Sequence, residues 1–88
     1  GLKNQLYLHC LNYQTIRERV AYWIVGMNNL TPNEAVHMPC SQAVLANMLH
    51  VSRASLNQEL KLMEKEGFFK IVKKEMREVD MARLNELL

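Results

Sequence analysis

Apolar or bulky positions in the first third of the chain recur in steps of three and four residues. The series consists of Leu2, Leu6, His9, Tyr13, Ile16, Val20, Trp23 and Met27. Because this spacing places side chains on one face of an α-helix, residues 2–27 are predicted to be mostly helical. Thr15 and Glu18 have the spacing of a capping box, which begins a helix. We therefore expect a break over residues 12–15 and a second helix over residues 16–26.

A turn-rich stretch over residues 28–33 follows these helices. Its asparagines, threonine and proline favour turns, so this stretch is the linker candidate of the chain. Just before Pro39, residues 36–38 favour a short strand, because the residue that precedes a proline avoids helical geometry.

Two helices joined by a turn of about three residues are predicted next. Ser41 is an N-cap candidate for a helix over residues 41–49, and Ser52 for a helix that continues to Gly67, a residue type that commonly ends helices. The expected inward positions of the first helix are Val44, Leu45, Met48 and Leu49, and those of the second are Leu56, Leu60 and Met63. This arrangement is that of a helix-turn-helix.

The hydrophobic period changes after Gly67. Strand-favouring residues flank a polar segment over residues 73–75, which predicts a β-hairpin. They are Phe68, Phe69, Ile71 and Val72 before it, and Met76 and Val79 after it. Asp80 is an N-cap candidate for a last helix whose apolar side carries Met81, Leu84, Leu87 and Leu88. The predicted fold class is mainly α with a small β-hairpin wing, which is the organisation of a winged helix-turn-helix.

The exposed face of the second helix of the pair carries side chains that can read DNA bases. If the leucines and the methionine of this helix face the core, the opposite face presents Arg53, Ala54, Asn57, Gln58 and Lys61. Arginine can bond to both O6 and N7 of guanine, and asparagine or glutamine to N6 and N7 of adenine. The predicted base-reading residues are therefore Arg53, Ala54, Asn57 and Gln58.

Basic residues are in modest excess around this helix and the hairpin. From Arg53 to Arg77 there are seven basic residues and four acidic ones, a local net charge of +3, whereas the whole chain has a formal charge of +2. Cations and hydroxyl groups beside a DNA groove contact phosphates and add affinity that is independent of sequence. The predicted phosphate-contacting residues are Ser41, Ser52, Ser55, Lys61, Lys70, Lys73, Lys74 and Arg77.

Most of this chain resembles the DNA-binding domain of the Crp/Fnr family, the bacterial transcription regulators related to the cyclic-AMP receptor protein. The segment LANMLHVSRASLNQELKLMEKEG over residues 45–67 is similar to the helix-turn-helix signature of that family. Upstream, IRERVAYWIVGM over residues 16–27 resembles the helix that follows the family's dimerisation helix. Downstream, MREVDMARLNELL over residues 76–88 resembles its last strand and terminal helix. The resemblance covers nearly all of residues 16–88.

The resemblance implies sequence-specific DNA binding by the output domain of a transcription regulator. Residues 1–14 would be the tail of a dimerisation helix, and residues 15–88 the winged helix-turn-helix domain with a recognition helix over about 52–66. A β-roll domain that binds a cyclic nucleotide or another effector would precede Gly1, and no cofactor is expected in the segment itself. The implied partners are palindromic double-stranded DNA, a second copy of the protein, and RNA polymerase. In the family, the residue that matches Arg53 reads a guanine in each half-site.

Three positions depart from the family pattern. Gln58 stands where members often carry a second arginine, and Ala54 stands where they have an acidic residue or serine. The site preference of a relative therefore cannot be transferred to this chain. His50 replaces the usual turn glycine. Histidine tolerates a positive φ better than most residues, so we expect the turn to persist.

Composition indicates the number of domains, whether the chain crosses a membrane, and its compartment. A chain of 88 residues with 49% hydrophobic and 23% charged residues is one globular domain, not two and not a disordered tail. It contains no apolar run long enough to cross a membrane, so no membrane partner is expected. Cys10 and Cys40 form no CxxC pair, which favours a reducing, cytoplasmic location.

Metal binding, catalysis and protein docking are the alternatives to DNA binding. No metal site is predicted, because the candidate ligands lack the usual spacing of zinc ligands; they are His9, Cys10, His37 and Cys40. Cys40 has no third residue to orient a base beside it, so an enzyme is not expected. Winged helices also serve as protein-docking modules, and three acidic residues of the second helix leave that alternative open; they are Glu59, Glu64 and Glu66.

Overall fold

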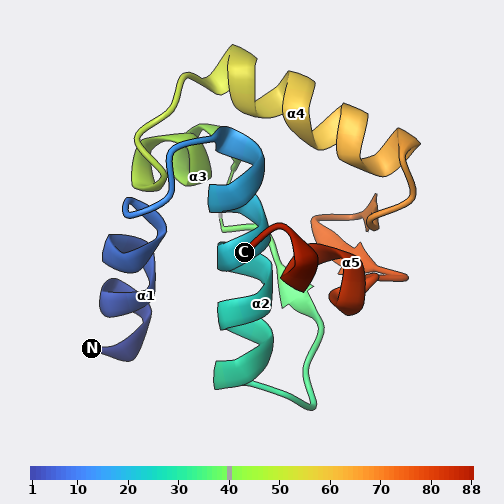
Figure 1. Cartoon of the computed structure of the whole chain (residues 1–88), viewed down its shortest axis with the longest axis horizontal. Helices are drawn as coiled ribbons and strands as arrows, with labels where there is room; N and C mark the ends of the chain where they lie inside the picture. The colour runs from blue at the N-terminus through green and yellow to red at the C-terminus, as the bar shows by residue number, and fades with distance from the viewer. Residues whose placement is uncertain (40) are drawn as a thin grey trace.

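The computed structural model describes residues 1–39 and 41–88, and within these residues it contains five helices and three short strands (Figure 1). The helices are α1 (Leu2–Cys10), α2 (Ile16–Leu30), α3 (Gln42–Met48), α4 (Arg53–Lys65) and α5 (Met81–Glu86). The strands are β1 (Val36–His37), β2 (Lys70–Val72) and β3 (Glu75–Arg77). Helix α2 runs through the middle of the molecule, with α1 packed on one side of it and α5 on another.

The predicted start of α2 is confirmed. The Thr15 hydroxyl accepts a hydrogen bond from the backbone N–H of Glu18 at 3.1 Å. In return, the Glu18 carboxylate accepts one from the backbone N–H of Thr15 at 3.0 Å. Both partners of the capping box are thus present, and α1 and α2 are separate helices.

Helix α2 ends at Leu30 rather than near Gly26. The glycine has a packing role instead, because Leu6 of α1 lies directly against its backbone. A Cβ atom at position 26 would stand 2.1 Å from Leu6 Cδ1. Gly26 therefore permits the close approach of α1 and does not end the helix.

Helix α1 buries only part of the face that the spacing predicts. Leu6 and Cys10 are buried, whereas Leu2 and His9, which belong to the same series, are exposed. The reason is that α1 packs mainly on α2, so the residues that lie away from α2 stay exposed. Burial raises the pKa of the Cys10 thiol to about 11, because the charged thiolate is disfavoured away from water.

The small sheet has three antiparallel strands in the order β1-β3-β2. The predicted hairpin is formed by β2 and β3. The sheet also has a third strand that was not predicted to join it, because β1 pairs with β3 through Val36 and Met76. The strand assignment of Phe68 and Phe69 is wrong: both rings are buried before β2 begins. The backbone of Phe68 is bonded elsewhere, to Met63 and Asp80, so it cannot join the ladder. Val79 likewise follows the end of β3.

The helix-turn-helix packs on α2 through one hydrophobic core. Its largest fully buried side chains are Trp23, Phe69, Ile24, Leu45, Leu49, Leu56, Leu60, Met63 and Leu84. Val44 is exposed, contrary to the prediction, and Ala46 is buried in α3 instead. In α5, Leu84 faces the core whereas Leu88 is exposed. The mainly helical fold with a small antiparallel sheet is a winged helix-turn-helix, as predicted.

Candidate nucleic-acid interface

An open groove of about 710 Å³ collects residues from both helices of the helix-turn-helix and from the wing. Its lining residues are Ser41, Gln42, Arg53, Ala54, Asn57 and Lys74. Three of them are predicted base-reading residues, and two are predicted phosphate contacts. The fold therefore brings together residues as far apart in sequence as Ser41 and Lys74.

The N-terminal half of α4 presents Arg53 and Asn57 to this groove because of how the helix begins and which face it buries. Ser52 is the N-cap, and its hydroxyl accepts a hydrogen bond from the backbone N–H of Ser55 at 3.1 Å. The side chains of Leu56, Leu60 and Met63 on the opposite face are buried, as predicted. Arg53 is exposed and Asn57 is half-buried. Neither side chain hydrogen-bonds to any of the residues that the structure describes.

Gln58, the fourth predicted base-reading residue, lies outside the groove. It borders a separate shallow surface on α4 together with Lys61, Leu62 and Lys65. The helical rotation of 100° per residue explains this separation, since position 58 is turned away from positions 53 and 57. Lys61, a predicted phosphate contact, shares that second surface.

The turn between α3 and α4 persists with histidine in place of glycine. His50 adopts a φ of 56°, in the left-handed region that glycine usually occupies. Arg19 of α2 supports the same turn, because its Nη1 donates a hydrogen bond to the carbonyl oxygen of Leu49 at 2.9 Å. Its Nε also donates to the carbonyl oxygen of Tyr13 at 2.8 Å, so one side chain ties the start of α2 to the end of α3. Sequence analysis missed Arg19.

The tip of the wing is a two-residue turn formed by Lys73 and Lys74. Their φ values are 50° and 65°, and two positive φ values in succession are the signature of a type I′ turn. Such turns favour glycine, which has no Cβ, and asparagine, whose short polar side chain tolerates a positive φ. Two lysines therefore occupy a position where the backbone alone would favour other residues.

The other two predicted phosphate contacts on the wing have acidic partners. Lys70 Nζ lies 2.9 Å from Glu78 Oε2, and this hydrogen bond raises the pKa of Lys70. Arg77 Nε lies 2.8 Å from Glu75 Oε1. Both cations are therefore partly neutralised locally, in contrast to Lys73, whose side chain has no hydrogen bond or ion pair among the described residues.

Gln42 is a groove residue that sequence analysis did not select. It is the first residue of α3, directly after the Ser41 cap, whose hydroxyl accepts a hydrogen bond from the backbone N–H of Val44 at 3.2 Å. The N-cap itself was the available signal, because the residue after a cap lies at the exposed start of a helix.

Across residues 1–39 and 41–88, no three His, Cys, Asp or Glu side chains gather in a geometry that could hold a metal ion. Cys40, which entered the zinc and nucleophile alternatives, lies outside these residues. None of the described helices combines the length and the apolar character that a membrane crossing requires.

Comparison with protein families agrees with the fold. The family model of the Crp-like helix-turn-helix domain matches residues 18–87. No curated protein and no solved structure gives a significant match to the chain. The matched residues span most of the chain and contain both helices of the helix-turn-helix, the wing and all of the groove residues. The chain therefore belongs to the Crp-like helix-turn-helix family and is a DNA-binding domain of a transcription regulator.

Proposed function

We propose that this domain recognises a specific double-stranded DNA sequence by placing α4 in the major groove and the wing tip against the phosphate backbone. The observation that carries the proposal is the single groove that Arg53, Ala54 and Asn57 share with Ser41 and Lys74. Base-reading and phosphate-binding chemistry are thus combined on one face of the molecule, as a DNA-reading surface requires.

The side chains of α4 supply the base contacts. Arg53 bonds to O6 and N7 of a guanine, and Asn57 bonds to N6 and N7 of an adenine. Ala54 between them offers a methyl group that packs against a thymine methyl. Gln58 follows Asn57 by one residue and lies on the neighbouring face of α4, so it contributes at the edge of the contact.

The phosphate contacts come from both flanks of the helix. Ser41, Ser52 and Ser55 cap or follow helix starts, where hydroxyl and backbone N–H groups favour anions. Lys73 and Lys74 contribute from the wing tip, and Lys61 from α4. Lys70 and Arg77 contribute less, because each must break an ion pair before it can bind a phosphate. Lys70 is paired with Glu78, and Arg77 with Glu75.

The family membership leads to a proposal for the whole regulator. Residues 1–14 form the end of a dimerisation helix, and residues 15–88 form the DNA-binding domain. A second copy places an equivalent α4 about one helical turn of DNA away, roughly 34 Å, so the site is palindromic. An effector such as a cyclic nucleotide binds an N-terminal domain, RNA polymerase is a further partner, and the regulator acts in the cytoplasm.

One observation favours a second candidate function, the docking of another protein. Leu62 is 52% exposed on α4, beside Lys61 and Lys65. In this alternative, Leu62 makes the apolar contact with the partner protein and the two lysines flank it.

Selection of duplexes from a random pool, followed by fluorescence anisotropy across a salt series, distinguishes the two functions. A DNA reader enriches a defined motif and loses affinity steeply with salt, because phosphate contacts release counterions. A protein-docking module enriches no motif and binds duplexes weakly or not at all. Failure to enrich a motif would contradict the proposed function.

A further inference from the structure

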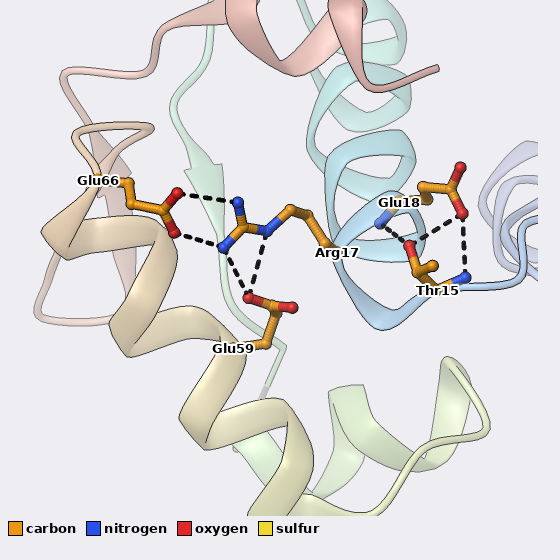
Figure 2. A network of polar contacts seen from close by, with 5 residues as sticks. All are labelled: Thr15, Arg17, Glu18, Glu59 and Glu66. Atoms are coloured by element: carbon orange, nitrogen blue, oxygen red, sulfur yellow. Dashed lines mark hydrogen bonds and ion pairs between the residues drawn. The ribbon is translucent and has the colours of Figure 1, made fainter.

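A polar cluster joins the inner side of α4 to the start of α2 (Figure 2). Arg17 of α2 points between Glu59 of α4 and Glu66, the C-cap of that helix. Its Nε and Nη2 donate hydrogen bonds to Glu59 Oε2 at 3.3 and 3.0 Å. Its Nη1 and Nη2 donate to the two carboxylate oxygens of Glu66 at 3.1 and 2.5 Å. One guanidinium group therefore holds two carboxylates that lie two helical turns apart on α4.

The same cluster extends to the C-terminal end of α4 through Phe68. The guanidinium carbon of Arg17 lies 5.4 Å from the centroid of the Phe68 ring, and that of Arg83 lies 4.1 Å from it. Arg83 Nη1 also donates a hydrogen bond to the carbonyl oxygen of Glu66 at 2.7 Å. The end of α4 is thus attached to both α2 and α5.

These contacts are partly shielded from water and strongly directional. The side chain of Arg17 is 25% exposed and that of Glu59 is 21% exposed. Hydrogen bonding from Arg17 lowers the pKa of Glu66, so the carboxylate stays charged in the pair. A planar guanidinium group fixes the direction of its carboxylate partners, which a single ammonium group cannot do.

Attachment at two points along a helix restricts both its tilt and its rotation about its own axis. Arg53 and Asn57 read bases only if they stand at the correct angle to the groove, because bidentate base contacts require alignment of two bonds at once. Glu59 follows Asn57 by two residues on the same helix. A small rotation at Glu59 therefore displaces the groove residues directly.

We propose that Arg17 is a positioning residue for DNA recognition: by pairing with Glu59 and Glu66, it sets the orientation at which α4 presents Arg53 and Asn57 to the bases. The inference rests on the proposed function. Arg17 touches no base or phosphate in this scheme, and its effect reaches the DNA only through α4.

The test compares the wild-type protein with Arg17→Met, Arg17→Lys and the double variant Arg17→Met/Glu59→Gln. Anisotropy titrations with the selected duplex and with a scrambled duplex give a discrimination ratio, and thermal unfolding by circular dichroism gives the stability. Lys3→Met serves as the matched control, because it removes the same charge from the exposed surface of α1.

We expect Arg17→Met to lose stability and to lower the discrimination ratio about tenfold, the scale of one misaligned base contact. The double variant also neutralises Glu59, the less exposed of the two carboxylates that Arg17→Met leaves unpaired, so its stability recovers. Its discrimination ratio stays low, because the attachment is still absent. Arg17→Lys retains the charge but reaches one carboxylate at a time, so it recovers the ratio only in part. Lys3→Met keeps the wild-type ratio.

A purely structural role for Arg17 gives a different pattern. If the discrimination ratio recovers together with stability in the double variant, if Arg17→Lys equals the wild type, or if Arg17→Met retains the wild-type ratio, the positioning role is overturned. These results leave the proposed function intact, since the wild-type protein still discriminates. A wild-type protein that shows no preference between the two duplexes overturns both.

Discussion

The backbone N–H of Met38 donates a hydrogen bond to the carbonyl oxygen of Lys74 at 2.7 Å. This bond continues the β1–β3 pairing and ties the segment before α3 to the turn at the tip of the wing. It explains why Ser41 and Lys74 border the same groove although they lie in different parts of the fold. This hydrogen bond therefore fixes the position of the wing beside the helix-turn-helix.

We expect the two lysines at the wing tip to lower the stability of the fold and to raise its affinity for phosphates. Replacement by the pair that favours this turn, Lys73→Asn with Lys74→Gly, relieves strain of about 1–2 kcal/mol at position 74, where glycine removes the Cβ, and less at position 73. The variant should therefore unfold at a higher temperature and yet bind every duplex more weakly. The slope of log affinity against log salt should become shallower by up to about one unit for each lysine removed.

Calorimetry and anisotropy titrations across a salt series measure the two effects separately. Lys3→Met, which removes a charge from α1, should leave the slope unchanged. A slope in the wing variant equal to that of the wild type would remove the wing from the interface.

Glu66 should titrate below its ordinary pKa of 4.5 because Arg17 stabilises the carboxylate. Its folded pKa is depressed, so the stability that the pair contributes is fully present above pH 4.5. It is lost as the pH falls through the depressed value. NMR titration of the side-chain carboxyl carbon should show a midpoint below 4.5 that moves back towards 4.5 in Arg17→Met.

Glu18 provides the internal control for that titration. Its pKa is also lowered, but by hydrogen bonds from Thr15, so its midpoint should stay depressed when Arg17 is replaced. If both midpoints moved together, the change would reflect general loosening of the fold and not the loss of one ion pair.

Much of the local structure could be predicted because its determinants lie close together in sequence. The capping box of Thr15 and Glu18 and the caps at Ser41, Ser52 and Asp80 each join residues three positions apart. Helical periodicity likewise identified the buried face of α4 and hence Arg53 and Asn57 on the opposite face.

Features that depend on distant pairs could not be predicted from periodicity. Leu6 and Gly26 meet across two helices, so the role of Gly26 is visible only once α1 is placed. Arg17 and Glu59 are 42 positions apart, and each alone has the pattern of a solvent-exposed charge. The pairing of β1 with β3 also required the fold, because a strand of two residues has almost no pattern of its own.

Cys10 should report whether α1 stays packed on α2. The thiol is fully buried and its pKa is raised to about 11 by burial, so alkylation at neutral pH should be much slower than in the unfolded chain. A Cys40→Ser background makes Cys10 the single reporter. Gly26→Val, whose side chain displaces Leu6, should speed the alkylation. Equal rates in the folded and unfolded protein would contradict the packing of α1.

The most direct measurement of the central claim is the change in discrimination when Arg53 and its base are altered together. The selected duplex is compared with one in which the guanine of each half-site is replaced, for both the wild-type protein and Arg53→Ala. The account predicts that the wild type loses about 1–3 kcal/mol of binding free energy on the altered duplex, whereas Arg53→Ala binds both duplexes alike. An equal loss in the two proteins, or no loss in the wild type, would contradict base reading by α4.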